Sequence, residues 1–313
     1  AVEYGKKALE AIKIMKWTDN SIKTVVCGSA SSGMPTYPEW DRIVLEHTYD
    51  YADYISIHRY FENFGNDDDF LASFKDMDDF IKTSIATCDY VKAYKRSSKN
   101  MMLSFDEWNI WYQQNQKEHP WEKAPRILED HYSLLDALAF GGMAITLLNH
   151  ADRVKVACLA QLVNVIAPIF TEPGKGAYRQ SIYWPFRDIS VYGRGIALQP
   201  VVQTENKITD KYGEVPAVIF AGTYNEETKE ISVFALNTNK TQVSETQIDL
   251  RSFENTKMTF RTELCGDDLS LTNSLENPDA VSPKKVELSQ SDNGIYTVNL
   301  KPASWNVIRF SVC

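Results

Sequence analysis

The pattern of hydrophobic and polar positions changes once along the chain. From Ala1 to about Ser190, short β-branched runs alternate with long stretches of helical period, which predicts β-α units and a parallel sheet. After residues 185–194, short alternating apolar and polar runs are separated by polar turns. Their regular spacing predicts an all-β sandwich. We therefore expect two domains, residues 1–194 and residues 195–313.

The first domain contains four predicted β-α units. Helices are expected over residues 1–16, 38–52, 66–94 and 127–150, and strands over residues 23–28, 53–58, 101–105 and 154–162. Asn66 and the acidic residues after it suit the positive N-terminus of the third helix. Four such units fit either a small doubly wound domain or half of an eight-unit barrel, and periodicity alone does not choose between them. In the second domain, strands are expected over residues 217–220, 231–235, 257–264, 294–300 and 304–310.

The formal net charge of -9 disfavours nucleic acid or an anionic membrane surface as a partner, because both require a basic face. A neutral substrate is compatible with this charge. The longest nearly unbroken apolar stretch, residues 138–148, is well short of the roughly 20 residues that span a bilayer, so no membrane helix is expected.

The 5 cysteines are widely scattered, and no C-x-x-C occurs, which argues against a disulfide framework or a zinc site. We expect buried thiols. Scattered cysteines favour a reducing compartment, the cytoplasm. The chain starts with Ala1 in a Lys-rich amphipathic stretch without the features of a signal peptide, so any export signal would lie before residue 1.

The strongest candidate for catalysis is the segment Ser104-Phe-Asp-Glu-Trp-Asn109, where an apolar strand runs into two adjacent acids. The carboxyl ends of strands form the active-site face of parallel α/β folds, so Glu107 is a catalytic candidate. The alternative is an acid that caps a loop or pairs with a nearby base. The second strand similarly places His58 and Tyr60 on one face, where His58 is either a pocket residue or a structural histidine.

Two amides, Gln161 and Asn164, interrupt the apolar run of the fourth unit. Buried amides need hydrogen-bond partners, which a sugar hydroxyl or a neighbouring loop can supply. Among the aromatic residues near these strand ends, Trp111 and Trp121 lie on loops that follow strands and are candidates for stacking on a sugar. The sequence contains no P-loop, no H-E-x-x-H and no complete G-x-G-x-x-G, so nucleotide and metalloprotease functions are disfavoured.

Several separate motifs, in order along essentially the whole chain, resemble glycoside hydrolase family 51, the α-L-arabinofuranosidases. They are Met34-Pro-Thr-Tyr-Pro-Glu-Trp40, His47-Thr-Tyr-Asp-Tyr51, Asp53-Tyr-Ile-Ser-Ile-His58, Ser104-Phe-Asp-Glu-Trp-Asn109 and residues 151–168. The resemblance implies a (β/α)₈ barrel, of which residues 1–194 are the C-terminal half, followed by a β-sandwich. It implies a retaining double displacement without a cofactor, on arabinan, arabinoxylan or their oligosaccharides, in a homo-oligomer.

The resemblance also implies roles for individual residues. Glu107 stands at the nucleophile position of the D-E-W-N motif, and Tyr60 matches the tyrosine that contacts the nucleophile. Trp111 matches the aromatic residue that shapes the arabinose subsite, and Gln161 matches an amide that contacts the sugar. His58 and Asn109 are placed among the substrate-binding residues through their motifs.

The chain departs from the family pattern at the acid/base glutamate, which belongs to a G-N-E motif that is absent here. Retaining hydrolysis needs two carboxyl groups about 5 Å apart. We therefore expect a partial chain that is inactive by itself and lacks the N-terminal half of the barrel, about four β-α units. Two alternatives remain open: an endo-acting β-glucanase or xylanase of the same family, and a carbohydrate-binding relative without catalysis.

Overall fold

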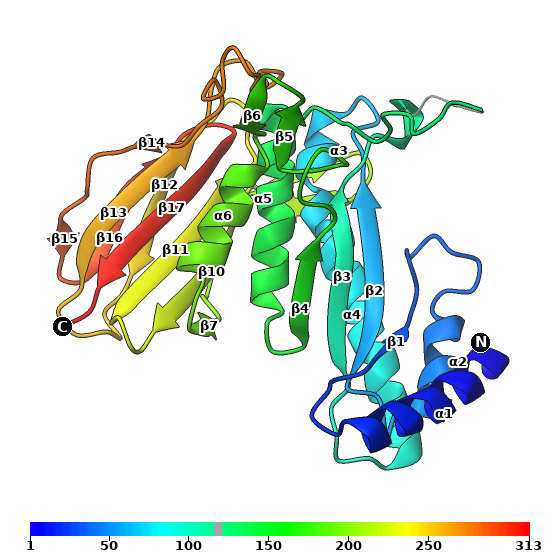
Figure 1. Ribbon diagram of the computed structural model, residues 1–313. Coiled ribbons are helices and arrows are strands. Elements are labelled where there is room, and N and C mark those ends of the chain that lie inside the picture. Colours follow the sequence, from blue (N-terminus) through cyan, green and yellow to red (C-terminus); the bar gives the residue numbers. More distant parts are fainter. Residues whose placement is uncertain (116–120) are drawn as a thin grey trace. The chain divides into compact units, whose positions relative to one another are not determined.

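Four consecutive strands form one sheet in the computed structural model, which describes residues 1–115 and 121–313 (Figure 1). β1 (Val25–Cys27), β2 (Tyr54–Phe61), β3 (Met102–Ile110) and β4 (Val154–Leu159) lie in the order β1-β2-β3-β4, and the β1–β2 and β3–β4 pairs are parallel. A doubly wound sheet reverses its strand order at a switch point, whereas each barrel strand neighbours the next one along the chain. The strand order therefore confirms the expectation of half a barrel.

Compact packing divides the described chain into two units. The first comprises Ala1–Tyr60, Asp76–Asn109 and His150–Ala160, and the second comprises Phe61–Lys75, Ile110–Asn149 and Gln161–Cys313. The boundary expected between residues 194 and 195 remains a prediction.

The predicted helices are present with shifted ends. α1 (Val2–Thr18) and α2 (Glu39–Thr48) confirm the first two. The third is divided into α3 (Asp67–Leu71) and α4 (Ser73–Lys95). Asn66 caps α3 as expected, because its side-chain oxygen accepts the backbone N–H groups of the second and third helical residues at 3.1 and 3.2 Å.

The fourth helix, α5 (Leu134–Asn149), begins seven residues later than expected. Ser133 and Asp136 form a reciprocal capping box: the Asp136 carboxylate accepts the Ser133 backbone N–H at 2.7 Å, and the Ser133 hydroxyl oxygen accepts the Asp136 N–H at 3.3 Å. This Ser-x-x-Asp signal stands in the sequence and fixes the start of α5. The short helices η1 (Gln113–Asn115) and α6 (Tyr183–Tyr192) complete the set.

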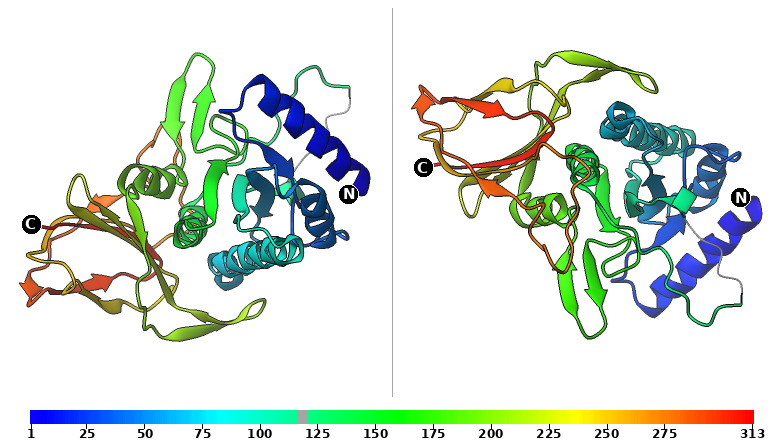
Figure 2. Two further views of the ribbon diagram at one scale, coloured as in Figure 1. Left: turned by 90° about the horizontal axis from the view of Figure 1, so that it is seen from below. Right: turned by 90° about the horizontal axis from the view of Figure 1, so that it is seen from above.

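The second unit contains the expected sandwich, with two antiparallel sheets in separate layers (Figure 2). The six-stranded sheet has the order β14-β13-β17-β11-β10-β7, and the three-stranded sheet has the order β12-β16-β15. Their strands are β7 (Ile196–Leu198), β10 (Val218–Asn225), β11 (Glu230–Asn237), β12 (Ser244–Asp249), β13 (Lys257–Leu264), β14 (Lys284–Lys285), β15 (Ser291–Asp292), β16 (Ile295–Leu300) and β17 (Ser304–Ser311). Two hairpins, β5 (Ile169–Glu172) with β6 (Gly176–Arg179) and β8 (Asn206–Thr209) with β9 (Gly213–Pro216), are additional.

The six-stranded sheet is buried on both faces. On one face, Ile308 and Phe310 of β17 join the sandwich core together with Tyr296 of β16. On the other face, the Trp305 ring lies against α5, next to Gly141. Because alternate residues of a strand point to opposite faces, covering both faces requires apolar side chains at successive positions. This explains the nearly continuous apolar runs of β10 and β11.

No helix within residues 1–115 or 121–313 has both the length and the apolar character that a bilayer crossing requires. The expectation of buried thiols was wrong for most cysteines. Cys88 is buried, whereas Cys27, Cys158 and Cys313 are exposed and Cys265 is intermediate. Cys27 ends β1 and Cys158 belongs to β4, and a sequence pattern does not reveal that these strand positions face solvent.

The contact between α5 and β17 yields a stability prediction. A Cβ atom on Gly141 would lie 2.6 Å from the rigid Trp305 ring, whereas one on Gly142 would lie 3.1 Å from a terminal methyl of Leu236. We expect Gly141→Ala to lower the free energy of unfolding by about 1–2 kcal/mol, because overpacking outweighs the gain in helix propensity. Gly142→Ala should cost less, because the Leu236 side chain can rotate. Urea denaturation of both variants checks this, and equal stabilities would contradict it.

Candidate active site

Strand β2 presents a row of three polar side chains on one face. Ser56, His58 and Tyr60 are spaced two residues apart, so their side chains point to the same side of the strand. The His58 ring nitrogen Nε2 lies 3.1 Å from the Ser56 hydroxyl oxygen. The row therefore runs along β2 toward the end of the strand that carries Tyr60.

Strand β3 brings two consecutive carboxylates to this row. The expectation that the strand ends at Phe105 was wrong, because β3 continues to Ile110. Phe105 pairs with Ala157 and Trp108 pairs with Leu159, so two residues of β3 stand opposite one residue of β4. Such a bulge redirects side chains that would otherwise point to opposite faces. Asp106 and Glu107 occupy this bulge, and both contact the β2 row.

Glu107 is the better exposed of the two acids. Its Oε2 atom accepts a hydrogen bond from the Tyr60 hydroxyl at 3.1 Å and lies 3.4 Å from Nδ1 of His58. Among the described residues, Oε1 has no hydrogen bond or ion pair, and 48% of the side chain is exposed. Burial and then the Glu107 charge raise the pKa of Tyr60, which keeps the phenol protonated as a donor. One oxygen of Glu107 is thus held, and about half of the side chain is open to solvent.

Asp106 is held more firmly than Glu107. Its Oδ1 accepts the Ser56 hydroxyl at 2.7 Å and lies 3.0 Å from Nε2 of His58, and its Oδ2 accepts the Ser104 hydroxyl at 3.2 Å. Three polar groups therefore fix Asp106, whereas only Oε2 of Glu107 is held. The two adjacent acids differ in environment, and Glu107 is the one free to react.

The remaining predicted residues have different surroundings. Asn109 is fully buried, and its amide donates to the Ala160 carbonyl at 2.8 Å, which joins β3 to the end of β4. Trp111 and Gln161 belong to the second unit, where Trp111 is half-buried and Gln161 is exposed. The sugar contacts expected of these three residues remain predictions.

Two other candidates from the sequence have clear positions. The Asn164 side-chain oxygen accepts the backbone N–H and the hydroxyl of Thr171 at 2.7 and 3.1 Å, so it ties its loop together. The Trp121 side chain is fully exposed.

A buried acid that is linked to the site through Ser29 was not predicted from the sequence. Asp41 of α2 is 2% exposed, and its Oδ1 accepts the Ser29 hydroxyl at 2.9 Å. The Ser29 carbonyl in turn accepts the His58 backbone N–H at 3.2 Å, so the acid supports the residue at the centre of the β2 row. Burial raises the pKa of Asp41 to about 6, although the Ser29 hydrogen bonds oppose the shift.

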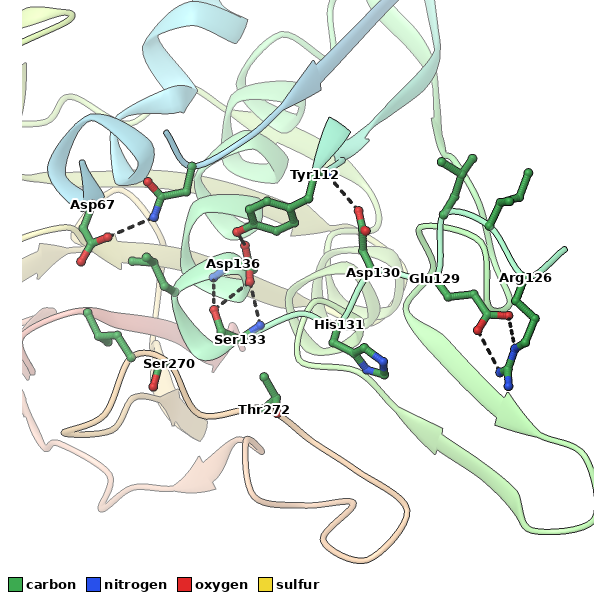
Figure 3. A pocket seen from close by; sticks show the side chains of 15 residues that line it. Asp67, Tyr112, Arg126, Glu129, Asp130, His131, Ser133, Asp136, Ser270 and Thr272 are labelled. Carbon is green, nitrogen blue, oxygen red and sulfur yellow. Dashed lines mark hydrogen bonds and ion pairs between the residues drawn. The ribbon is translucent and has the colours of Figure 1, made fainter. Parts of the chain in front are cut away.

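A cavity of about 740 Å³ in the second unit was also not expected from the sequence (Figure 3). Within it, Tyr112 donates from its hydroxyl to Asp136 at 2.5 Å and from its backbone N–H to Asp130 at 2.9 Å. Burial and the Asp136 charge raise the pKa of Tyr112, so this hydroxyl stays protonated. An ion pair at 2.8 Å joins Arg126 to Glu129. These groups hold the segment before α5 through contacts within the protein, and we assign them no catalytic role.

Comparison with known proteins gives one consistent result. Residues 106–304 match the family model described as the α-L-arabinofuranosidase C-terminal domain. The chain is 49% identical to the intracellular exo-α-(1→5)-L-arabinofuranosidase of Acetivibrio thermocellus, over 98% of this chain and 62% of that protein. It is 48% identical to the corresponding enzyme 1 of Bacillus subtilis, over 99% of this chain and 62% of that protein.

A solved structure supports the same relationship. The family 51 α-L-arabinofuranosidase of Bifidobacterium longum is similar with a TM-score of 0.92 and 34% identity, over 99% of this chain and 63% of that one. This chain thus spans less than two thirds of the length of these relatives.

The buried Asp41 yields a prediction for stability against pH. The unfolded carboxyl loses its proton near its ordinary pKa of 3.8, whereas the folded one retains it to about 6. The folded state therefore binds more protons in this window, and stability falls as the pH rises through it, by about 3 kcal/mol. Asn does not titrate, so the stability of Asp41→Asn relative to the native protein should rise from about pH 4 to about pH 7. Urea denaturation of both proteins at the two pH values measures this. A difference in stability between the two proteins that is the same at both pH values would rule it out.

Proposed function

The chain belongs to the family 51 α-L-arabinofuranosidases and carries their C-terminal domain, and we propose that the protein releases terminal α-L-arabinofuranosyl residues with retention of configuration. The observation that carries this proposal is the position of Glu107, half exposed at the bulge of β3 with only Oε2 held. A half-exposed carboxylate with one oxygen fixed and the other without a hydrogen bond suits attack on an anomeric carbon.

In the proposed reaction, the open oxygen of Glu107 forms a bond to the anomeric carbon while the bond to the leaving oxygen breaks. The leaving oxygen takes a proton from an acid, and water then hydrolyses the glycosyl-enzyme with that group acting as base. Tyr60 holds the nucleophile throughout, since its phenol stays protonated. Substrate-binding roles for Trp111, Gln161, Asn109 and His58 are proposed from their motifs.

The acid/base group is not assigned within this chain, which contains no G-N-E motif. The neighbouring Asp106 is bound by two serine hydroxyls, so it is poorly suited to donate a proton. We propose that another part of the protein, outside residues 1–313, supplies the acid together with the rest of the barrel. Residues 1–313 alone should then not hydrolyse the substrate. Sequencing the parent reading frame and assaying both polypeptides tests this.

The names of the relatives support more specific proposals about the substrate and the cellular location. The two bacterial relatives are named as intracellular exo-α-(1→5)-L-arabinofuranosidases. We accordingly propose α-(1→5)-linked arabino-oligosaccharides as substrates and the cytoplasm as the location. A homo-oligomer is also proposed, for which light scattering of the purified protein is the test.

Two rival functions make different demands on the site. An endo-acting enzyme of the same family would hydrolyse carboxymethyl cellulose or xylan and spare an aryl α-L-arabinofuranoside. A carbohydrate-binding protein would hold an oligosaccharide without cleaving it and has no need for an exposed carboxylate held by a tyrosine. Activity on carboxymethyl cellulose or xylan alone would defeat the proposed substrate.

Removal of the nucleophile should abolish hydrolysis. In the active polypeptide that carries residues 1–313, we expect Glu107→Gln to lower kcat on an aryl α-L-arabinofuranoside by at least about 10⁴-fold, since the covalent step is lost. Circular dichroism should show an unchanged fold, because Glu107 is half exposed. Unchanged turnover would remove Glu107 from the nucleophile role.

Loss of the phenol should weaken the reaction without abolishing it. Tyr60→Phe removes a single hydrogen bond to Oε2 of Glu107, so we expect kcat to fall about tenfold to a hundredfold. Glu107 is still retained by His58, which explains the intermediate size of the effect. Steady-state kinetics of Tyr60→Phe and Glu107→Gln compares the two losses of kcat. Equal losses in the two variants would contradict this role of Tyr60.

A further inference from the structure

The ring of His58 lies between two carboxylates. Its Nε2 atom is 3.0 Å from Oδ1 of Asp106, and its Nδ1 atom is 3.4 Å from Oε2 of Glu107. The ring is 27% exposed. Among the described residues, its side-chain partners are thus the two acids and the Ser56 hydroxyl, all of which belong to β2 or β3.

The chemistry of imidazole makes this arrangement dependent on Asp106. A neutral ring has one N–H donor and one acceptor nitrogen, so one nitrogen would direct a lone pair at a carboxylate. A protonated ring donates from both nitrogens. The contact of Nε2 with Asp106 fixes the rotation of the ring that directs Nδ1 to Glu107.

Asp106 is built into the strand as an anchor for this ring. The Ser56 and Ser104 hydroxyls donate to its two oxygens at 2.7 and 3.2 Å. These serines come from two adjacent strands, so the carboxylate cannot rotate without losing one of them. The Asp106 charge also affects the exposed thiols of Cys27 and Cys158. Burial, and after it nearby charges that include Asp106, raise the pKa values of both thiols.

The effect on Glu107 is to distinguish its two oxygens. Tyr60 and His58 both meet Oε2, from adjacent positions of the β2 row. Oε1 has no hydrogen bond or ion pair among the described residues. Without the His58 contact, one hydrogen bond from Tyr60 would remain, and the carboxylate could turn about it.

We propose that Asp106 is a positioning residue for the nucleophile, acting through His58, which holds Oε2 of Glu107 and leaves Oε1 to react. This rests on the proposed glycosidase function. His58 is then a bridge between two acids. The Asp106-Glu107 pair is explained as an anchor and a nucleophile, which a bulge of β3 places on the same row.

A double-substitution cycle in the active polypeptide that carries residues 1–313 tests the proposal. Asp106→Asn preserves shape but removes the charge, and we expect kcat to fall about 10²-fold with KM little changed. His58→Gln should cause a similar loss. In the double variant the losses should not multiply, and kcat should lie within about threefold of the single variants. Multiplied losses, or no loss in Asp106→Asn, would overturn the proposal.

The pH profile distinguishes positioning from a loss of folding. The nucleophile reacts as its anion, and a ring held against its oxygen stabilises that form. Because Asp106→Asn loosens the His58 ring that contacts Oε2, we expect the acid limb of kcat/KM to move to higher pH in this variant. A variant that is merely less stable would lose activity at every pH without moving this limb, and that result would contradict the proposal.

The same unit offers a matched control. His150 and Asp78 form a second histidine-aspartate pair at 2.7 Å, with side chains 16% and 24% exposed. Neither residue contacts Glu107. Asp78→Asn should therefore leave kcat and the pH profile unchanged. A shift of the profile in this variant as large as that in Asp106→Asn would mean that loss of any such pair produces the effect, and would overturn the proposal.

A measurement without substrate separates this proposal from the proposed function. Nitrogen NMR shifts of the His58 ring, assigned by their absence in His58→Gln, report its protonation and hydrogen bonding. We expect Asp106→Asn to change both ring nitrogens, and Asp78→Asn to change neither. If the native protein fails to cleave arabinofuranosides but the ring responds, the proposed function fails while the coupling of Asp106 to His58 stands. An unresponsive ring overturns the coupling, whatever the activity.

Discussion

The candidate site depends on one irregularity of the backbone. In a regular strand, Asp106 and Glu107 would point to opposite faces of the sheet, and at most one of them could meet the side chains of β2. The bulge between Phe105 and Trp108 removes that restriction. It lets two consecutive carboxylates share a row of hydroxyl and imidazole groups, and their different partners then give them different tasks.

The surroundings of the two acids show how a sheet can fix one charge and leave another available. Asp106 is bound by serines from two strands, whereas Glu107 is bound through one oxygen by long side chains of β2. Ser29 supports the β2 row, because its carbonyl accepts the His58 backbone N–H and its hydroxyl donates to the buried Asp41. A catalytic carboxylate needs a defined orientation and an open oxygen, and this combination provides both.

In the second unit, close packing and polar contacts restrict which side chains each position can hold. Its six-stranded sheet is covered on both faces, by the sandwich core and by α5, so a close contact such as that of Gly141 with Trp305 is possible only without a side chain on the helix. The polar network of Tyr112, Asp130 and Asp136 then holds the loop before α5. Several polar residues that stand out in the sequence, Asn164 among them, have such structural tasks.

The sequence by itself determined the order of the elements, the half-barrel followed by a sandwich, and the candidate nucleophile Glu107, because periodicity and motifs are local properties. It also contained the capping signals of Asn66 and of Ser133 with Asp136, which depend on neighbours along the chain. It did not determine the length of β3, since a bulge arises from pairing with a distant strand. Only the tertiary structure brought His58 between Asp106 and Glu107 and buried Asp41 against Ser29, because these contacts join residues that are separated in the sequence.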